Sequence, residues 1–145
     1  MRQRRSEYDV TDSVNTTDAS TVAAEVRRIY LDLYRKAQIE TLDRAFADFS
    51  ALYAGEHPDF HACDTGYHDV QHVLDVTLAM ARLIDGYERG REGKPPLDAA
   101  LFRLGVITAL FHDCGYVRER RDRQHAYGAE LTLTHVSRGS HFLKA

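Results

Sequence analysis

Apolar residues recur every three or four positions over several stretches of the chain, which is the spacing of amphipathic helices. Two such stretches lie within residues 20–54 and change phase near residues 38–41, where we expect a kink or a short connection. Two more cover residues 67–85 and 97–113, and a further helical pattern covers about residues 122–138. The pattern predicts that these segments are helical and that the protein has no sheet.

Polar and helix-breaking residues mark where the predicted helices begin and end. Residues 1–19 are polar without periodicity, and we expect a disordered polar tail there. Ser20 is a suitable N-cap for the first helix, and Gly86 is expected to end the third. Residues 86–96 then form a charged connection rich in glycine and proline, and Gly115 is expected to stop the fourth helix.

The composition excludes several classes of protein. With 145 residues the chain fits one domain, and a net charge of −3 gives no general attraction to nucleic acid or to an anionic membrane. No run approaches the 18 apolar residues of a membrane span, and no secretory signal is present, so we expect a cytoplasmic protein. Cys63 and Cys114 form no metal-binding pair and are expected to be reduced thiols. The sequence contains no signal for an oligomeric state.

The most apolar helix ends in a pair of metal-competent side chains. The run from Leu101 to Phe111 leads directly into His112-Asp113. Burying two polar groups at the end of an apolar helix costs free energy, because they lose their contacts with water. A bound divalent ion would offset that cost. All eight histidines of the chain lie between His57 and His141, which concentrates possible ligands in this half of the sequence.

A second histidine cluster lies about forty residues upstream. His68 and His72 are four positions apart and Asp75 follows three positions later, so a helix would place all three on one face. They would then present two imidazoles and a carboxylate to one point. An exposed polar stripe on an amphipathic helix explains the same spacing, and the sequence leaves the two interpretations open.

The segment after His112-Asp113 is rich in arginine. Arg118 and Arg121 are candidates for holding a phosphate group, although a solvated charged turn would have the same composition. His125 is a candidate further ligand or phosphate contact, and His135 and His141 are weaker candidates.

Two short motifs together resemble a known family. Tyr67-His68-Asp69-x-x-His72-x-x-Asp75-Val76 followed by Phe111-His112-Asp113 is similar to the HD-domain superfamily of metal-dependent phosphohydrolases. The first motif looks most like the cyclic-nucleotide phosphodiesterase branch, which usually has asparagine where this chain has Asp69. The resemblance covers about residues 20–136 and implies an all-α, HD-domain-like helical bundle, with the domain itself over residues 20–145.

The resemblance also implies a site and a reaction. A metal ion would be held by His72, His112, Asp113 and a later aspartate, and Asp113 would bridge to a second ion. His68 would donate a proton to the leaving oxygen, with Asp69 or Asp75 supplying compensating negative charge. The ligand types suit one or two ions of Zn, Mn, Fe, Co, Ni or Mg. The expected substrate is a small phosphate ester, including a phosphodiester such as a cyclic nucleotide.

The chain departs from the family at one point. After Asp113 the acidic residues are Glu119, Asp122 and Glu130, all too near to match the family's last aspartate. We therefore expect a domain truncated at its C-terminus, with weaker metal binding and little or no turnover from this chain alone. Two alternatives stay open: an HD-type di-iron oxygenase, and a non-catalytic helical module with a vestigial metal site.

Overall fold

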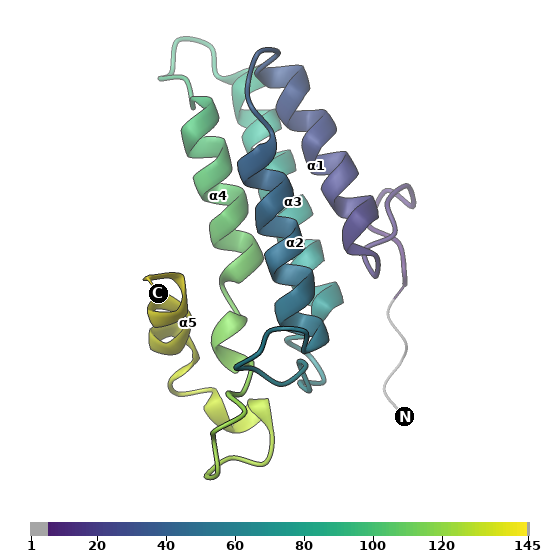
Figure 1. The fold of residues 1–145 in the computed structure, drawn as a ribbon. Helices are drawn as coiled ribbons and strands as arrows, with labels where there is room; N and C mark the ends of the chain where they lie inside the picture. The colour runs from purple at the N-terminus through teal and green to yellow at the C-terminus, as the bar shows by residue number, and fades with distance from the viewer. Residues whose placement is uncertain (1–5, 145) are drawn as a thin grey trace.

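Four helices run side by side and form the body of the protein (Figure 1). The computed structural model describes residues 6–144. The bundle consists of α1 (Ala19–Leu33), α2 (Glu40–Ala54), α3 (Val70–Gly90) and α4 (Ala99–Phe111). A shorter helix, α5 (His135–Lys144), lies beside the end of α4 (Figure 1). Residues 6–144 contain no strand element, so the prediction of an all-α protein is confirmed.

The bundle has two layers that share one hydrophobic core. α1 packs on α2 and α3, and α4 packs on α2 and α3. The largest side chains that are fully buried come from all four helices: Tyr30, Leu42, Phe49, Leu52, Leu74, Leu78, Phe102 and Leu110. Removing this apolar surface from water is the main favourable contribution to the fold.

Local hydrogen bonds set the helix starts. The sequence predicted Ser20 as the N-cap of the first helix, but Asp18 has that role and accepts a hydrogen bond from the Ser20 N–H. Asp69 caps α3 by accepting from the His72 N–H, and Asp98 caps α4 by accepting from the Leu101 N–H. A carboxylate at this position accepts a hydrogen bond from a free N–H group. Its negative charge also interacts favourably with the positive end of the helix dipole.

The third helix does not end at Gly86, as the sequence predicted. α3 continues to Gly90. Gly86 is exposed, and a methyl group added to it would meet no other atom within 4 Å. The glycine therefore weakens the helix by about 0.5–1 kcal/mol relative to alanine without interrupting it. The break between α1 and α2 falls at residues 34–39, close to the expected connection.

The predicted helix over residues 122–138 is wrong for most of its length. The segment contains a short 3₁₀ helix, Gly128–Leu131, and α5 begins only at His135. Asp122 accepts hydrogen bonds from the N–H groups of Gln124 and His125, and the Glu130 side chain accepts from that of Tyr127. Such side-chain acceptors offer the backbone an alternative to helical hydrogen bonds.

Gly115 has a different role from the helix stop that the sequence predicted. α4 already ends at Phe111, and Gly115 lies within the 3₁₀ helix Cys114–Tyr116. A Cβ atom at Gly115 would overlap the backbone carbonyl of His135. The absence of a side chain therefore lets the start of α5 lie directly against the end of α4.

The expected polar tail is described in part. Residues 1–5 of the predicted tail lie outside the described residues. Residues 6–18 form a turn against α3. Arg82 of α3 lies 2.6 Å from the carboxylate of Asp9 in this turn. The Gln71 side chain donates to the Ser6 carbonyl at 2.6 Å, and Val14 is buried beside the core. Among the described residues, no helix is both long enough and apolar enough to cross a membrane.

Candidate metal centre

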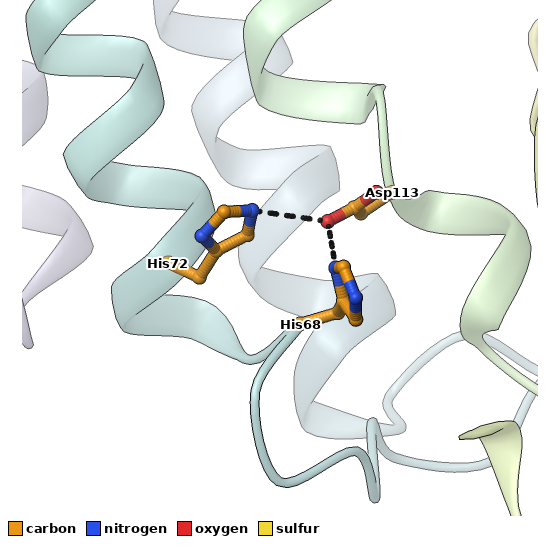
Figure 2. Close-up of side chains that lie close together, drawn as sticks. All are labelled: His68, His72 and Asp113. Atoms are coloured by element: carbon orange, nitrogen blue, oxygen red, sulfur yellow. Dashed lines mark hydrogen bonds and ion pairs between the residues drawn. The ribbon is translucent and has the colours of Figure 1, made fainter. Parts of the chain in front are cut away.

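Four imidazole rings surround the carboxylate of Asp113. One oxygen, Oδ2, lies 2.7 Å from His68 Nδ1, 3.1 Å from His112 Nε2 and 3.3 Å from His72 Nε2. The other oxygen, Oδ1, lies 4.0 Å from His135 Nε2. Figure 2 shows His72 pointing at Asp113 from the first turn of α3, and His68 pointing at it from the loop just before that helix. Asp113 is 3% exposed, so this carboxylate is buried among its histidines.

Three different parts of the fold bring these groups together. His72 lies in the first turn of α3, whereas His112 and Asp113 directly follow α4 and His135 begins α5. The start of α3 therefore meets the end of α4, with the His72 and His112 rings 5.5 Å apart. The two histidine clusters, about forty residues apart in the sequence, therefore share one location.

His68 is not on the helix face that the sequence predicted. It precedes the Asp69 N-cap, and its carbonyl accepts a hydrogen bond of 2.5 Å from the Thr65 hydroxyl. Its ring still reaches Asp113, because the chain turns just before α3 begins. The four-residue spacing predicted that His68 and His72 would share a helix face. Both rings do lie beside Asp113, but His68 does so from the loop before the helix.

The electrostatics keep Asp113 ionised. Burial by itself raises the pKa of Asp113, but hydrogen bonds with His112 and His68 outweigh it and hold the pKa at about 2. The same contact with Asp113 raises the pKa of His112 above its ordinary value, against the opposing effect of burial. The cluster therefore contains a stable negative charge at neutral pH, as a metal ligand requires.

The orientation of His112 fits a metal ligand. Its Nδ1 lies 2.6 Å from the Ala109 carbonyl, which only accepts, so Nδ1 carries the hydrogen. Without an ion, a proton on Nε2 makes the hydrogen bond with Asp113, and once that proton is lost the Nε2 lone pair points at the same carboxylate. Two electron-rich atoms 3.1 Å apart need a proton or a cation between them. A backbone carbonyl that fixes the far nitrogen is the usual support of a metal-bound histidine.

His135 has the same support and was only a weak candidate in the sequence. Its Nδ1 lies 2.6 Å from the Thr132 carbonyl, which leaves Nε2 directed at the cluster. No spacing rule connects His135 to the two motifs, because its location depends on the close approach of α5 to Gly115. Identifying His135 from the sequence would have required knowing that α5 packs against Gly115.

The distances fit a divalent ion with small movements. One ligand atom each from His68, His72 and Asp113 lie within 4.8 Å of one another. Ligand atoms about 2 Å from one ion lie at most about 4 Å apart, so modest side-chain rotations bring them into range. The sequence had placed His112 rather than His68 in the ligand set, and the structure brings both to Asp113.

Two tyrosines line the cluster, and the neighbouring Cys114 adds no ligand to it. The Tyr116 ring stacks on His68 and on His135, with 4.4 Å between centroids in each case. Tyr67 lies beside His68 and His72 and is half exposed. Burial raises the pKa of the Cys114 thiol to about 12, so it stays protonated and is no thiolate ligand.

The other predicted site residues have contacts outside the cluster. Arg118 lies 3.4 Å from the Asp64 carboxylate and donates to the His125 carbonyl. His125 Nδ1 lies 2.8 Å from Asp122, and the exposed Arg121 pairs with Glu119. These residues hold the loop before the Gly128–Leu131 helix together, and the contacts described for them do not reach Asp113.

The two acidic residues of the upstream motif also differ in role. Asp69 is the N-cap of α3, and its bond to the His72 N–H fixes the turn that carries His72. Asp75 is half-buried one turn further along α3. No contact described for residues 6–144 joins Asp75 to Asp113 or to its histidines.

Comparisons of the chain with protein-family models, with curated proteins and with solved structures find no match.

Proposed function

We propose that this protein hydrolyses a small phosphate ester with the help of a divalent metal ion held at Asp113. The observation that supports this most is the buried Asp113 oxygen with three imidazole nitrogens within 3.3 Å. The resemblance of the two histidine motifs to HD-domain phosphohydrolases supports the reaction class, with a phosphodiester such as a cyclic nucleotide among the substrates.

The ligand set consists of the carboxylate of Asp113 and the neutral rings of His72 and His112. When bound, a divalent ion supplies a hydroxide nucleophile near neutral pH and stabilises negative charge on phosphoryl oxygens. Imidazole nitrogens and carboxylate oxygens suit Zn, Mn, Fe, Co or Ni, and Mg would rely more on the carboxylate and water. His135 faces the second oxygen of Asp113, and the two would together help to hold a second ion.

His68 is proposed as the proton donor to the leaving oxygen. Its Nδ1 lies 2.7 Å from Asp113 Oδ2, so the carboxylate orients the ring. The Tyr116 ring stacks on the imidazole and limits its rotation. This arrangement leaves Nε2 of His68 to donate to a substrate, since the side chain is about one-third exposed.

The proposal is tested first on the unmodified chain. Purified protein is analysed for bound metal, and phosphodiesters and phosphomonoesters are then screened with Mn, Co, Ni, Zn and Mg. We expect slow turnover that requires the metal and that disappears in His112→Ala. His141→Ala is the matched control, because His141 is an exposed histidine of α5 that no described contact joins to Asp113.

Two outcomes would replace this proposal with one of the alternatives. Oxygen consumption with Fe(II), without phosphate release, would indicate the di-iron oxygenase. Metal binding without turnover of any phosphate ester or of oxygen would indicate a non-catalytic module.

A further inference from the structure

The outward side of the α3 and α4 pair carries no charge over most of its length. Between residues 76 and 88 of α3, and along the whole of α4, every exposed residue is uncharged. We define the α3/α4 face by these exposed residues: Ala79, Leu83, Gly86, Ala100, Leu101, Leu104 and Thr108. Leu83 is 70% exposed and Leu104 is 60% exposed, so large apolar side chains stand in water.

The residues on the two helices form one surface. Ala79, Leu83 and Gly86 follow one another at helical spacing on α3, as Ala100, Leu104 and Thr108 do on α4. The helices touch between these stripes, because a Cβ atom at Gly105 would lie 3.1 Å from Ile84 Cδ1 and 3.4 Å from Met80 Sδ. The two stripes therefore flank one groove.

The opposite layer of the bundle shows that this absence of charge is particular to the α3/α4 face. The exposed residues of α1 and α2 include seven charged ones, namely Arg27, Arg28, Asp32, Glu40, Asp43, Arg44 and Asp48. That layer has the pattern of a helix pair with one side in water. α4 instead has apolar residues on its exposed side as well as on its buried side, which is typical of a helix that is covered all round.

Charged residues near the α3/α4 face are engaged elsewhere. Arg82 is paired with Asp9, Asp85 with Arg89, and Arg103 donates to the Tyr30 hydroxyl in the core. The rim therefore offers no excess positive charge for an anionic lipid surface. A partner of either charge would also gain no ion pair at the centre of this face.

We propose that the α3/α4 face binds the same face of a second copy of this chain, forming a two-fold symmetric dimer. A two-fold axis brings a surface onto itself, so a surface whose charges have one sign would face like charges. An uncharged face avoids this repulsion. The small residues Ala79, Gly86 and Ala100 leave room for the leucines of the second copy, and four helices would then share one apolar centre.

The size of the face fits a weak dimer. α4 has 13 residues and is therefore about 20 Å long, and two adjacent helices are about 20 Å wide. Two such faces bury on the order of 1,000 Å² together, the lower range for specific association. We therefore expect a dissociation constant in the micromolar range, independent of the metal centre.

Sedimentation of the full chain from about 10 μM to about 1 mM tests the proposal. We expect a monomer–dimer equilibrium that a chelator does not change. Leu83→Glu and Leu104→Glu should each raise the dissociation constant at least tenfold, and their exposure means that the thermal melting temperature should hardly change. Ala47→Glu is the matched control, since it adds the same charge at an exposed position of α2.

A mixing experiment makes the test specific for self-pairing. Leu104→Glu and Leu104→Lys chains should each stay monomeric alone and associate when mixed one to one. A monomer at every concentration would overturn the proposal, and so would a dimer that both glutamate variants leave intact. Binding of a monomer to phosphatidylcholine vesicles through these leucines would also contradict it and identify a lipid surface as the occupant.

Discussion

At the scale of single residues, Asp113 determines what the site can do. Its carboxylate is buried and ionised, and each of its two oxygens faces at least one histidine. The His-Asp pair and the histidines four apart were visible in the sequence, because each follows a local spacing. His135 was only a weak candidate in the sequence, since its location depends on packing between α5 and the end of α4.

Alanine variants of His68 and His72 should differ in their effects on metal affinity and on rate. His72→Ala should lower metal affinity more than tenfold and lose activity with it, because a ligand is removed. His68→Ala should retain metal and lose about two to four orders of magnitude in rate, the usual contribution of a general acid. Calorimetric titration and steady-state kinetics measure the two effects. If His68→Ala loses metal and His72→Ala keeps it, the roles are exchanged.

At the scale of elements, Gly115 lets α5 lie against the end of α4 beside the Asp113 cluster. Gly115→Ala should be strongly destabilising, by about 1–3 kcal/mol or more, because its methyl group would overlap the His135 carbonyl. Gly86→Ala is the matched control in an open helical position and should stabilise the protein by about 0.5–1 kcal/mol. Urea unfolding measures both changes. Equal stabilities for the two variants would show that α5 does not lie against Gly115.

The segment before α1 gives a prediction for pH. Burial alone would raise the pKa of Asp9, but hydrogen bonds from Thr11, Val14 and Arg82 lower it well below its usual range. A carboxylate with a depressed pKa stabilises the folded state above its unfolded pKa of about 3.9, and this contribution is lost as the pH falls further. Asp9→Asn should therefore lower the free energy of unfolding by about 1–2 kcal/mol at pH 7.

The pH dependence of this difference in stability is the control for the Asp9→Asn experiment. The difference between the original chain and Asp9→Asn should shrink as the pH falls from about 4 towards 2. A difference that stays constant over this interval would mean that Asp9 is not held by Arg82 and its turn. The sequence did not reveal this contact, because Asp9 and Arg82 belong to segments far apart in the chain.

At the scale of the whole molecule, the apolar pattern predicted the four helices of the bundle better than the segment that follows them. α3 and α4 follow their apolar periodicity, and the phase change near residues 38–41 corresponds closely to the break between α1 and α2. The segment over residues 122–138 differs because Asp122 and Glu130 bind backbone N–H groups in place of a helix. The exposed leucines of α4 followed the same apolar pattern as the core, so the pattern alone did not separate a buried side from the α3/α4 face.

The central claim is that Asp113 and its histidines hold a divalent ion, and Asp113→Asn tests it most directly. Asparagine keeps the size of the side chain and removes the charge that the ion requires. Metal analysis and calorimetric titration with Mn and Zn should show one or two ions per chain in the original protein. We expect the variant to bind them at least tenfold more weakly. Equal metal content and affinity in the two proteins would contradict the account and place any metal site elsewhere.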